Sequence, residues 1–241
     1  MVIEMLNRGI RPTHIIFADT GGEKPETYEY VWRFAEWCEA RGLLLLLLRP
    51  PRRAYANTLE QQCAHYLDLP SRVFGSGHCA AEWKIEPRDV FLKALPTRPI
   101  VAIGFDGGEE HRAAGKKQVT KLAWQWYPLI EWSISRVECK RIIERAGLPV
   151  PPKSACFFCP SSKKAEIIEL SRKHPALMAR ALEMERRATS PEGKAHTVQG
   201  LGREWSWAEL LAADETKREK LREAVPGCVT CDDDACPTGE D

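Results

Sequence analysis

One stretch of sequence decides the fold: Thr13-His-Ile-Ile-Phe-Ala-Asp-Thr-Gly-Gly-Glu-Lys-Pro-Glu-Thr27. Its apolar run ends at Asp19, a loop with two glycines follows, and Pro25 is placed to begin a helix. Open parallel sheets bind ligands at the carboxyl ends of their strands. The stretch therefore predicts a strand end at which a ligand binds, and the alternative is an ordinary strand-to-helix turn with a polar rim.

The sequence around this loop predicts a strand–helix–strand unit. A helix is expected from Pro25 to about Arg41, because apolar side chains recur there at helical spacing. The run Leu43–Leu48 is apolar at every position, which is typical of a strand that is buried on both faces. Residues 1–8 resemble the end of a helix, and Gly9 is placed to terminate it.

Further strands and helices alternate along the chain, which favours the α/β class. We expect, in order, a helix at 57–67, a loop at 71–86, a helix at 87–95, strands at 99–105 and 124–130, and a helix that begins at Ser133 or Ser135 and ends at Gly147. The proline-rich connector 148–153 predicts a boundary. We therefore expect an α/β core at 1–147 and a helical extension with cysteines at 148–241.

Composition limits the classes of function. The chain has 241 residues and a net charge of +1, so its overall charge does not indicate a nucleic-acid or membrane-surface protein. Leu43–Leu48 is too short to cross a bilayer. The sequence also shows no pattern of an export signal. With nine cysteines, some of them at metal-like spacing, the sequence predicts thiol or metal chemistry in the cytoplasm.

Several motifs, in this order, resemble the phosphoadenosine phosphosulfate (PAPS) reductase-like family, in its phage and bacterial branch. The motifs are Asp19-Thr-Gly-Gly-Glu-Lys-Pro-Glu-Thr-Tyr28, Cys79 with Trp83-Lys-Ile-Glu-Pro87, Ile103-Gly-Phe-Asp106 with Glu109 and Arg112, Tyr127-Pro-Leu-Ile-Glu-Trp132, Gly147-Leu-Pro-Val-Pro-Pro-Lys-Ser-Ala-Cys-Phe-Phe-Cys-Pro160, Gly200-Leu-Gly-Arg203 and Trp205-Ser-Trp207. This branch belongs to the adenine nucleotide alpha-hydrolase, or PP-loop, superfamily.

The resemblance implies an open, mainly parallel sheet with helices on both faces and an adenine nucleotide at the strand ends. The nucleotide or substrate site implied by it consists of Asp19, Thr20, Gly21, Glu23, Lys84, Asp106, Glu109 and Arg112. Arginine and lysine suit a phosphate or sulfonate group. No catalytic residue is assigned by the resemblance.

The sequence departs from the family pattern at two places. The phosphate-binding PP-loop of the superfamily is expected before residues 7–9, and we interpret the core as N-terminally incomplete, either as a fragment or through loss of that loop. Assimilatory reductases end in a Glu-Cys-Gly-(Leu/Ile)-His tail, whereas this tail contains Cys228, Cys231 and Cys236. The resemblance therefore predicts descent from PAPS reductases and sulfurtransferases and leaves the activity open.

Two Cys-x-x-Cys pairs have the spacing of metal ligands or of a redox dithiol. The candidate ligand sets are Cys79, Cys139, Cys156 and Cys159, or alternatively Cys156, Cys159, Cys228 and Cys231. A 4Fe-4S cluster and zinc both fit the spacing. For Cys139, the alternative is a buried thiol on a helix.

Two classes of function follow. The first is an enzyme that binds ATP or a PAPS-like nucleotide and acts in sulfonucleotide reduction or ATP-dependent sulfur transfer. The alternative is a non-catalytic, metal-stabilised module in a phage or nucleic-acid-modification complex. The partners that we consider are the nucleotide substrate, a sulfur donor or acceptor protein, a nucleic acid and a second copy of the chain, and we expect no membrane partner.

Overall fold

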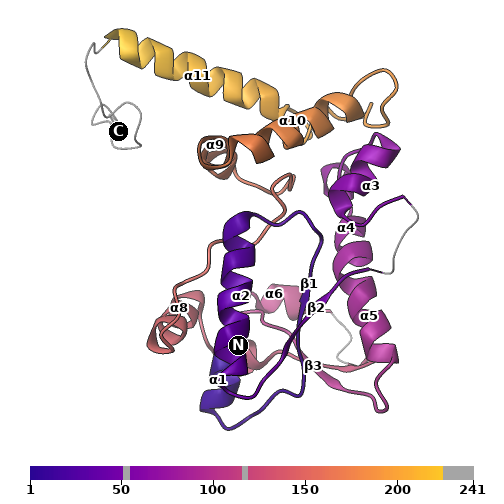
Figure 1. Ribbon diagram of the computed structural model, residues 1–241, viewed down its shortest axis with the longest axis vertical. Helices are drawn as coiled ribbons and strands as arrows, with labels where there is room; N and C mark the ends of the chain where they lie inside the picture. The colour runs from indigo at the N-terminus through magenta and orange to yellow at the C-terminus, as the bar shows by residue number, and fades with distance from the viewer. Residues whose placement is uncertain (51–54, 116–118, 225–241) are drawn as a thin grey trace. The chain divides into compact units, whose positions relative to one another are not determined.

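The computed structural model describes residues 1–50, 55–115 and 119–224, with side chains up to residue 220. The chain forms two compact units (Figure 1). The first contains residues 1–58 and 78–156, and the second contains 59–77 and the described residues from 157 onward. The units divide after Cys156 rather than at residue 148, and the second unit also takes a segment from the middle of the predicted core.

The first unit contains two small parallel sheets. β1 (Ile15–Ala18) pairs with β2 (Leu45–Leu48), and β3 (Ile100–Ala102) pairs with β4 (Trp124–Trp126). The helix α2 (Pro25–Glu39) joins β1 to β2, so the predicted strand–helix–strand unit is confirmed. The described chain is thus a mixture of helices and small parallel sheets, and a single open sheet stays a prediction.

Leu43–Leu48 was predicted to be a strand that is buried on both faces, and the predicted burial is wrong. The strand itself forms over Leu45–Leu48, but all four of its residues are only half-buried. Leu44, just before the strand, is 68% exposed. Within the described residues β2 pairs with β1 alone, and an edge strand keeps part of its surface in contact with solvent.

The segment 71–86, predicted as a loop, is largely helical. It contains η1, a 3₁₀ helix at Ser71–Phe74 in the second unit. In the first unit, three consecutive pieces form one helical segment: α4 (His78–Ala80), the π-helical turn η2 (Ala81–Ile85) and α5 (Glu86–Lys93). Such short pieces, interrupted by Gly75 and Gly77, have too few residues to show a helical period. Trp83, which is fully buried, anchors the π-helical turn.

The remaining helices of the first unit are α1 (Val2–Asn7), α6 (Glu110–Ala113), α7 (Pro128–Glu131) and α8 (Arg136–Arg145). Pro128 begins α7, so the predicted strand at 124–130 is short. Ser135 caps α8, because its hydroxyl accepts a hydrogen bond from the Glu138 backbone N–H at 3.3 Å. Apolar side chains of α1, α7 and α8 and of the segments beside them form one core cluster: Ile3, Leu129, Ile134, Ile142 and Leu148.

The second unit is helical. Its helices are α3 (Leu59–Tyr66), η1, α9 (Lys164–Lys173), α10 (Pro175–Ala188) and α11 (Trp207–Ala224), and α10 packs against α3, α9 and α11. The predicted helix at 57–67 is confirmed as α3. None of the helices in the described ranges has the length and apolar character that crossing a membrane requires.

A buried carboxylate organises the second unit. Glu185 on α10 is 3% exposed, and its oxygens accept hydrogen bonds from three backbone N–H groups, those of Leu201 at 2.6 Å, Trp207 at 3.0 Å and Ala208 at 3.2 Å. Two of these donors belong to the first turn of α11, where a helix has unpaired N–H groups. Gly200 is required beside it, because a Cβ atom there would lie 2.3 Å from the Glu185 carboxylate. Glu185 therefore fixes where α11 begins.

Replacement of Glu185 by Ala should lower the free energy of unfolding by about 3 kcal/mol or more, since it leaves three backbone donors without their acceptor. Urea denaturation followed by tryptophan fluorescence measures the change. The control is Glu183→Ala on the same helix, where an exposed ion pair with Arg186 is removed and a change below about 0.5 kcal/mol is expected. Equal effects of the two substitutions would contradict the role of Glu185.

Candidate functional site

Asp19, the first residue after β1, is buried and uses both of its carboxylate oxygens. Oδ1 accepts hydrogen bonds from the Gly21 N–H and the Tyr28 hydroxyl, each at 2.8 Å. Oδ2 accepts two hydrogen bonds from the guanidinium of Arg49, at 3.0 and 2.8 Å. Gly21 has a φ of +70°, and a Cβ atom there would lie 2.3 Å from a methyl group of Thr58. These contacts hold the loop after β1 in one shape.

Glu23, at the other end of this loop, connects three distant segments. Its side chain is fully buried, and its two oxygens accept hydrogen bonds from Lys84 Nζ at 3.2 Å and from Ser154 Oγ at 3.0 Å. The backbone of Glu23 also forms an isolated antiparallel bridge with Cys156. A buried carboxylate is stable only when it is paired and hydrogen-bonded, and Glu23 is both. The loop is thereby joined to the π-helical turn and to residues 154–156.

Thr20 brings a thiol into the same site. Its hydroxyl oxygen lies 3.1 Å from Cys156 Sγ, within hydrogen-bonding distance for a contact with sulfur. The Thr20 hydroxyl also accepts a hydrogen bond from the Gly22 N–H at 3.3 Å. Thr20 is buried and Cys156 is half-buried. The structure thus places one cysteine of the first Cys-x-x-Cys pair directly against the loop after β1.

The second predicted strand end lies beyond β3. The Asp106 carboxylate accepts a hydrogen bond from the Gly108 N–H at 2.9 Å, and Glu109 accepts one from the Asp106 N–H at 3.3 Å. Arg112 forms an ion pair with Glu109, and its guanidinium lies 4.2 Å from the centre of the Phe105 ring. The hydrogen bond from Arg112 is the main cause of a lowered pKa at Glu109, so the Glu109 carboxyl is ionised at neutral pH.

A cavity of about 700 Å³ in the first unit is lined by residues of β1, β2 and α2, of the loop and helix after β3, and of the segment before Cys156. It is lined by β1 and α2 on one side and by Glu109, Arg112, Arg136, Lys153 and Ser154 on the other. Ser154 therefore touches both the Glu23 carboxylate and the cavity. This volume is in the range of pockets that hold small molecules.

Thr27 supplies a polar group to this cavity. Thr27 lines the cavity and is 6% exposed. Its hydroxyl is buried and has no hydrogen-bond partner among the described residues. Buried hydroxyl groups normally have a partner, so the Thr27 hydroxyl is an exception among the buried polar groups of the first unit.

The structure does not bring the predicted cysteine ligands together. Among the described residues, no three His, Cys, Asp or Glu side chains are placed to hold a metal ion. Cys139 packs against the core cluster of α1, α7 and α8, and burial raises the pKa of its thiol, as expected for the alternative of a buried thiol. The second ligand set includes Cys228 and Cys231, which lie outside the described residues. Ligation by cysteine thus stays a prediction.

Sequence reasoning anticipated part of this site. Asp19, Thr20, Gly21, Glu23 and Lys84 lie together, and Asp106, Glu109 and Arg112 form the second group. The residues that it missed are Thr27, Tyr28, Arg49, Arg136, Lys153 and Ser154. Thr27, Tyr28, Lys153 and Ser154 stand inside the motifs quoted above, and this was the signal by which they could have been found. The carboxylates of Asp19 and Glu23 accept hydrogen bonds from protein donors and do not line the cavity, whereas Glu109 and Arg112 do.

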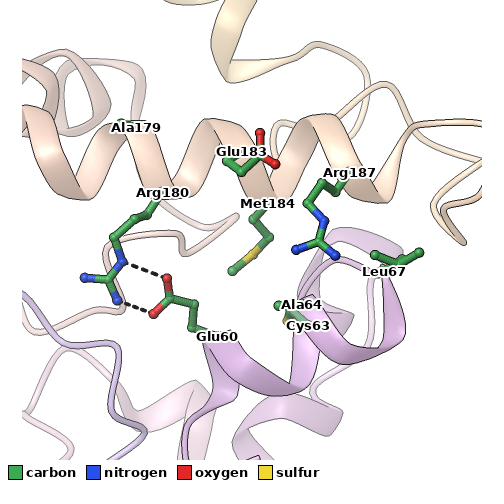
Figure 2. A pocket seen from close by; sticks show the side chains of 9 residues that line it. All are labelled: Glu60, Cys63, Ala64, Leu67, Ala179, Arg180, Glu183, Met184 and Arg187. Carbon is green, nitrogen blue, oxygen red and sulfur yellow. Dashed lines mark hydrogen bonds and ion pairs between the residues drawn. The ribbon is translucent and has the colours of Figure 1, made fainter.

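A second cavity, of about 330 Å³, lies between α3 and α10 in the second unit (Figure 2). Cys63, Leu67 and Met184 supply much of its apolar lining, and Glu60 forms a two-bond ion pair with Arg180 at its side. It contains none of the residues that the sequence predicts for the nucleotide site.

Neither a scan of the sequence against protein-family models nor a search of curated proteins finds a match.

Tyr28 should stabilise the protein in a pH-dependent way. Burial, and then the hydrogen bond to Asp19, raises the pKa of Tyr28 well above its ordinary value near ~10. Because the pKa is raised in the folded state, the contribution is complete below pH ~10 and is lost as the pH rises further. Tyr28→Phe should therefore cost about 1 kcal/mol at pH 7, and the difference from the parent should shrink above pH ~10.

Urea denaturation of both proteins between pH 7 and 11 measures this difference. Tyr66→Phe, at a tyrosine of the second unit, is the control. A difference between Tyr28→Phe and the parent that stays constant or grows above pH ~10 would contradict the assignment.

Proposed function

We propose that this chain belongs to the PAPS reductase-like family and binds an adenine nucleotide, ATP or a PAPS-like sulfonucleotide, for sulfonucleotide reduction or ATP-dependent sulfur transfer. The observation that carries the proposal is the cavity to which the loop after β1 and the loop after β3 are both connected, the first through Ser154 and the second through Glu109 and Arg112. In an open α/β sheet, ligands bind at such strand ends. The proposal includes an open, mainly parallel sheet with helices on both faces.

The basic residues of the cavity suit the phosphate or sulfonate groups of the nucleotide. Arg112, Arg136 and Lys153 line it together with a single carboxylate, that of Glu109. A guanidinium group binds a phosphate through two parallel hydrogen bonds. The Thr27 hydroxyl and the Ser154 hydroxyl provide neutral hydrogen-bonding groups for the sugar or the phosphates.

The apolar side of the cavity suits the base. Side chains of β1 and α2, among them Ile16, Val31 and Phe34, form this side. Adenine buries a flat, largely apolar surface, and ligand pockets are commonly lined by apolar and aromatic side chains with a few polar groups. Cys156, held against Thr20, is the thiol closest to the loop after β1 on which sulfur chemistry would act.

Isothermal titration calorimetry with ATP and with a sulfonucleotide tests the proposal. Arg112→Ala should weaken nucleotide binding roughly ten- to a hundredfold, which is the effect of losing one charge-assisted hydrogen bond to a phosphate. Arg186→Ala is a matched control, because Arg186 also pairs with a glutamate three residues before it and lies in the second unit. This control should bind nucleotide like the parent.

The absence of measurable heat with both nucleotides at ~1 mM would contradict nucleotide binding. An equal loss of affinity in Arg112→Ala and Arg186→Ala would contradict the site. Binding of ATP without binding of the sulfonucleotide would favour sulfur transfer over sulfonucleotide reduction.

A further inference from the structure

A second basic feature of the first unit lies on a different surface. It is a groove of about 570 Å³, which we call the arginine groove, lined by Ile3, Leu6, Asn7, Gly9, Arg11, Trp37, Arg41, Arg145 and Ala146. These residues come from α1 and the segment after it, from the end of α2 and from the end of α8. Three of the lining residues are arginines, and none is Asp or Glu.

Two of these arginines carry charges that no carboxylate balances. Arg11 donates a hydrogen bond to the Arg41 carbonyl at 2.7 Å, and Arg41 donates one to the Trp37 carbonyl at 3.0 Å. These acceptors are neutral, and within the described part of the chain neither guanidinium forms an ion pair. The hydrogen bonds hold both groups in fixed positions at the groove and leave their positive charges available to an anion.

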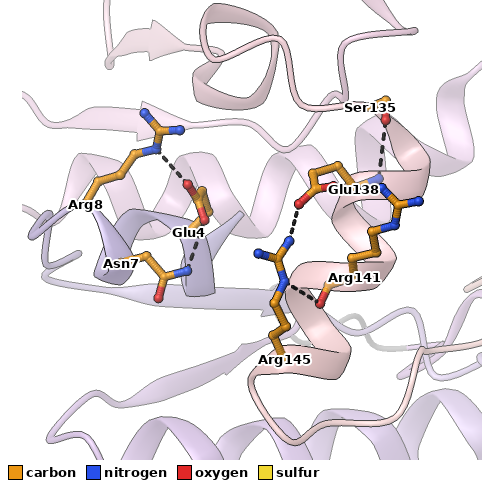
Figure 3. A network of polar contacts seen from close by, with 7 residues as sticks. All are labelled: Glu4, Asn7, Arg8, Ser135, Glu138, Arg141 and Arg145. Carbon is orange, nitrogen blue, oxygen red and sulfur yellow. Dashed lines mark hydrogen bonds and ion pairs between the residues drawn. The ribbon is translucent and has the colours of Figure 1, made fainter.

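The α1 and α8 helices extend this charge beyond the groove (Figure 3). Glu4 accepts hydrogen bonds from both Asn7 and Arg8, and Glu138 pairs with both Arg141 and Arg145. The lining of the groove itself thus contains three arginines (Arg11, Arg41 and Arg145) and no carboxylate, and Arg8 and Arg141 of the same helices pair with Glu4 and Glu138. Positive charge is therefore in excess over a surface made by three elements.

The form of this surface indicates which anion it suits. A free phosphate would occupy one or two guanidinium groups, whereas arginines on three separate elements can contact several phosphates of one strand. Trp37 offers little for a base to stack on. Its ring packs against Phe34 and lies 3.8 Å from the Arg41 guanidinium, and its indole N–H donates to the Ala146 carbonyl at 3.1 Å. Contact through phosphates without base stacking indicates binding that does not depend on sequence.

We propose that the arginine groove binds the sugar–phosphate backbone of a nucleic acid strand. This proposal does not rest on the nucleotide site, because the two sets of lining residues have no member in common. If the nucleotide site and the arginine groove both bind the ligands proposed for them, the nucleic acid is a candidate acceptor of the transferred sulfur. The near-zero net charge of the chain is compatible with this, because the relevant charge is local.

Fluorescence anisotropy with a labelled mixed-sequence 20-nucleotide single strand, as DNA and as RNA, tests the proposal in 50 and 200 mM salt. The parent should bind with a Kd between about 1 and 100 µM at the lower salt, as for other sequence-independent binding to phosphates. The double variant Arg11→Ala, Arg41→Ala should weaken binding at least tenfold. It should also reduce the slope of log K against log salt by about 2, roughly one for each guanidinium that no longer neutralises a phosphate.

Arg33→Ala is the matched control, since Arg33 is exposed on α2 and does not line the groove. It should change the Kd less than twofold. Circular dichroism checks that each variant is folded. The single charge reversal Arg11→Glu, at an exposed residue outside any helix, provides a second variant if the double variant unfolds.

The proposal would be overturned by no binding of either strand by the parent, by equal effects of the groove variants and Arg33→Ala, or by displacement of the strand by polyglutamate as effectively as by unlabelled strand. Failure of the nucleotide site is distinguishable, because Arg112→Ala and saturating ATP should leave strand binding unchanged. Competition by inorganic phosphate at low millimolar concentration would likewise overturn the proposal and indicate a site for a single anion.

Discussion

The buried Glu23 carboxylate is the interaction on which the candidate site depends. Its two oxygens are shared between Lys84 and Ser154, and its backbone pairs with Cys156. A buried carboxylate without such donors would be costly, so these segments have to meet at this position. The loop after β1, the π-helical turn and the segment that carries the thiol are therefore positioned together by one charged group.

A buried carboxylate also organises the second unit, but its hydrogen-bond donors are of a different kind. Glu185 is also a buried carboxylate, but backbone N–H groups take the place of a lysine and a serine. A box formed by Ser206 and Glu209, in which each side chain accepts a hydrogen bond from the backbone of the other, fixes the start of α11 as well. Each unit is thus organised by a carboxylate whose removal would leave donors unpaired, whereas the exposed ion pairs contribute much less.

The parts of the fold that local sequence determines were predictable. The apolar run before Asp19, the proline at the start of α2 and the cap at Ser135 all act within a few residues, and the corresponding elements form. The burial of β2 was not predictable, because it depends on which strands lie beside it. In the site, the motifs pointed to Glu23 and Lys84 as functional residues. They did not predict that the two side chains form an ion pair, because no periodicity of the sequence relates residues so far apart. Asp19 was predicted to face a ligand, and its pairing with Arg49 instead depends on the parallel register of β1 and β2.

The π-helical turn at 81–85 has a consequence for the register of its helix. A turn of this kind contains one residue more than an α-helical turn, so it changes the angular phase between the residues before and after it. One residue corresponds to about 100° of rotation. Cys79, before the turn, and Leu92, after it, face their present surroundings only with that extra residue in place. The length of this segment, and not only its composition, therefore determines which of its side chains face the site.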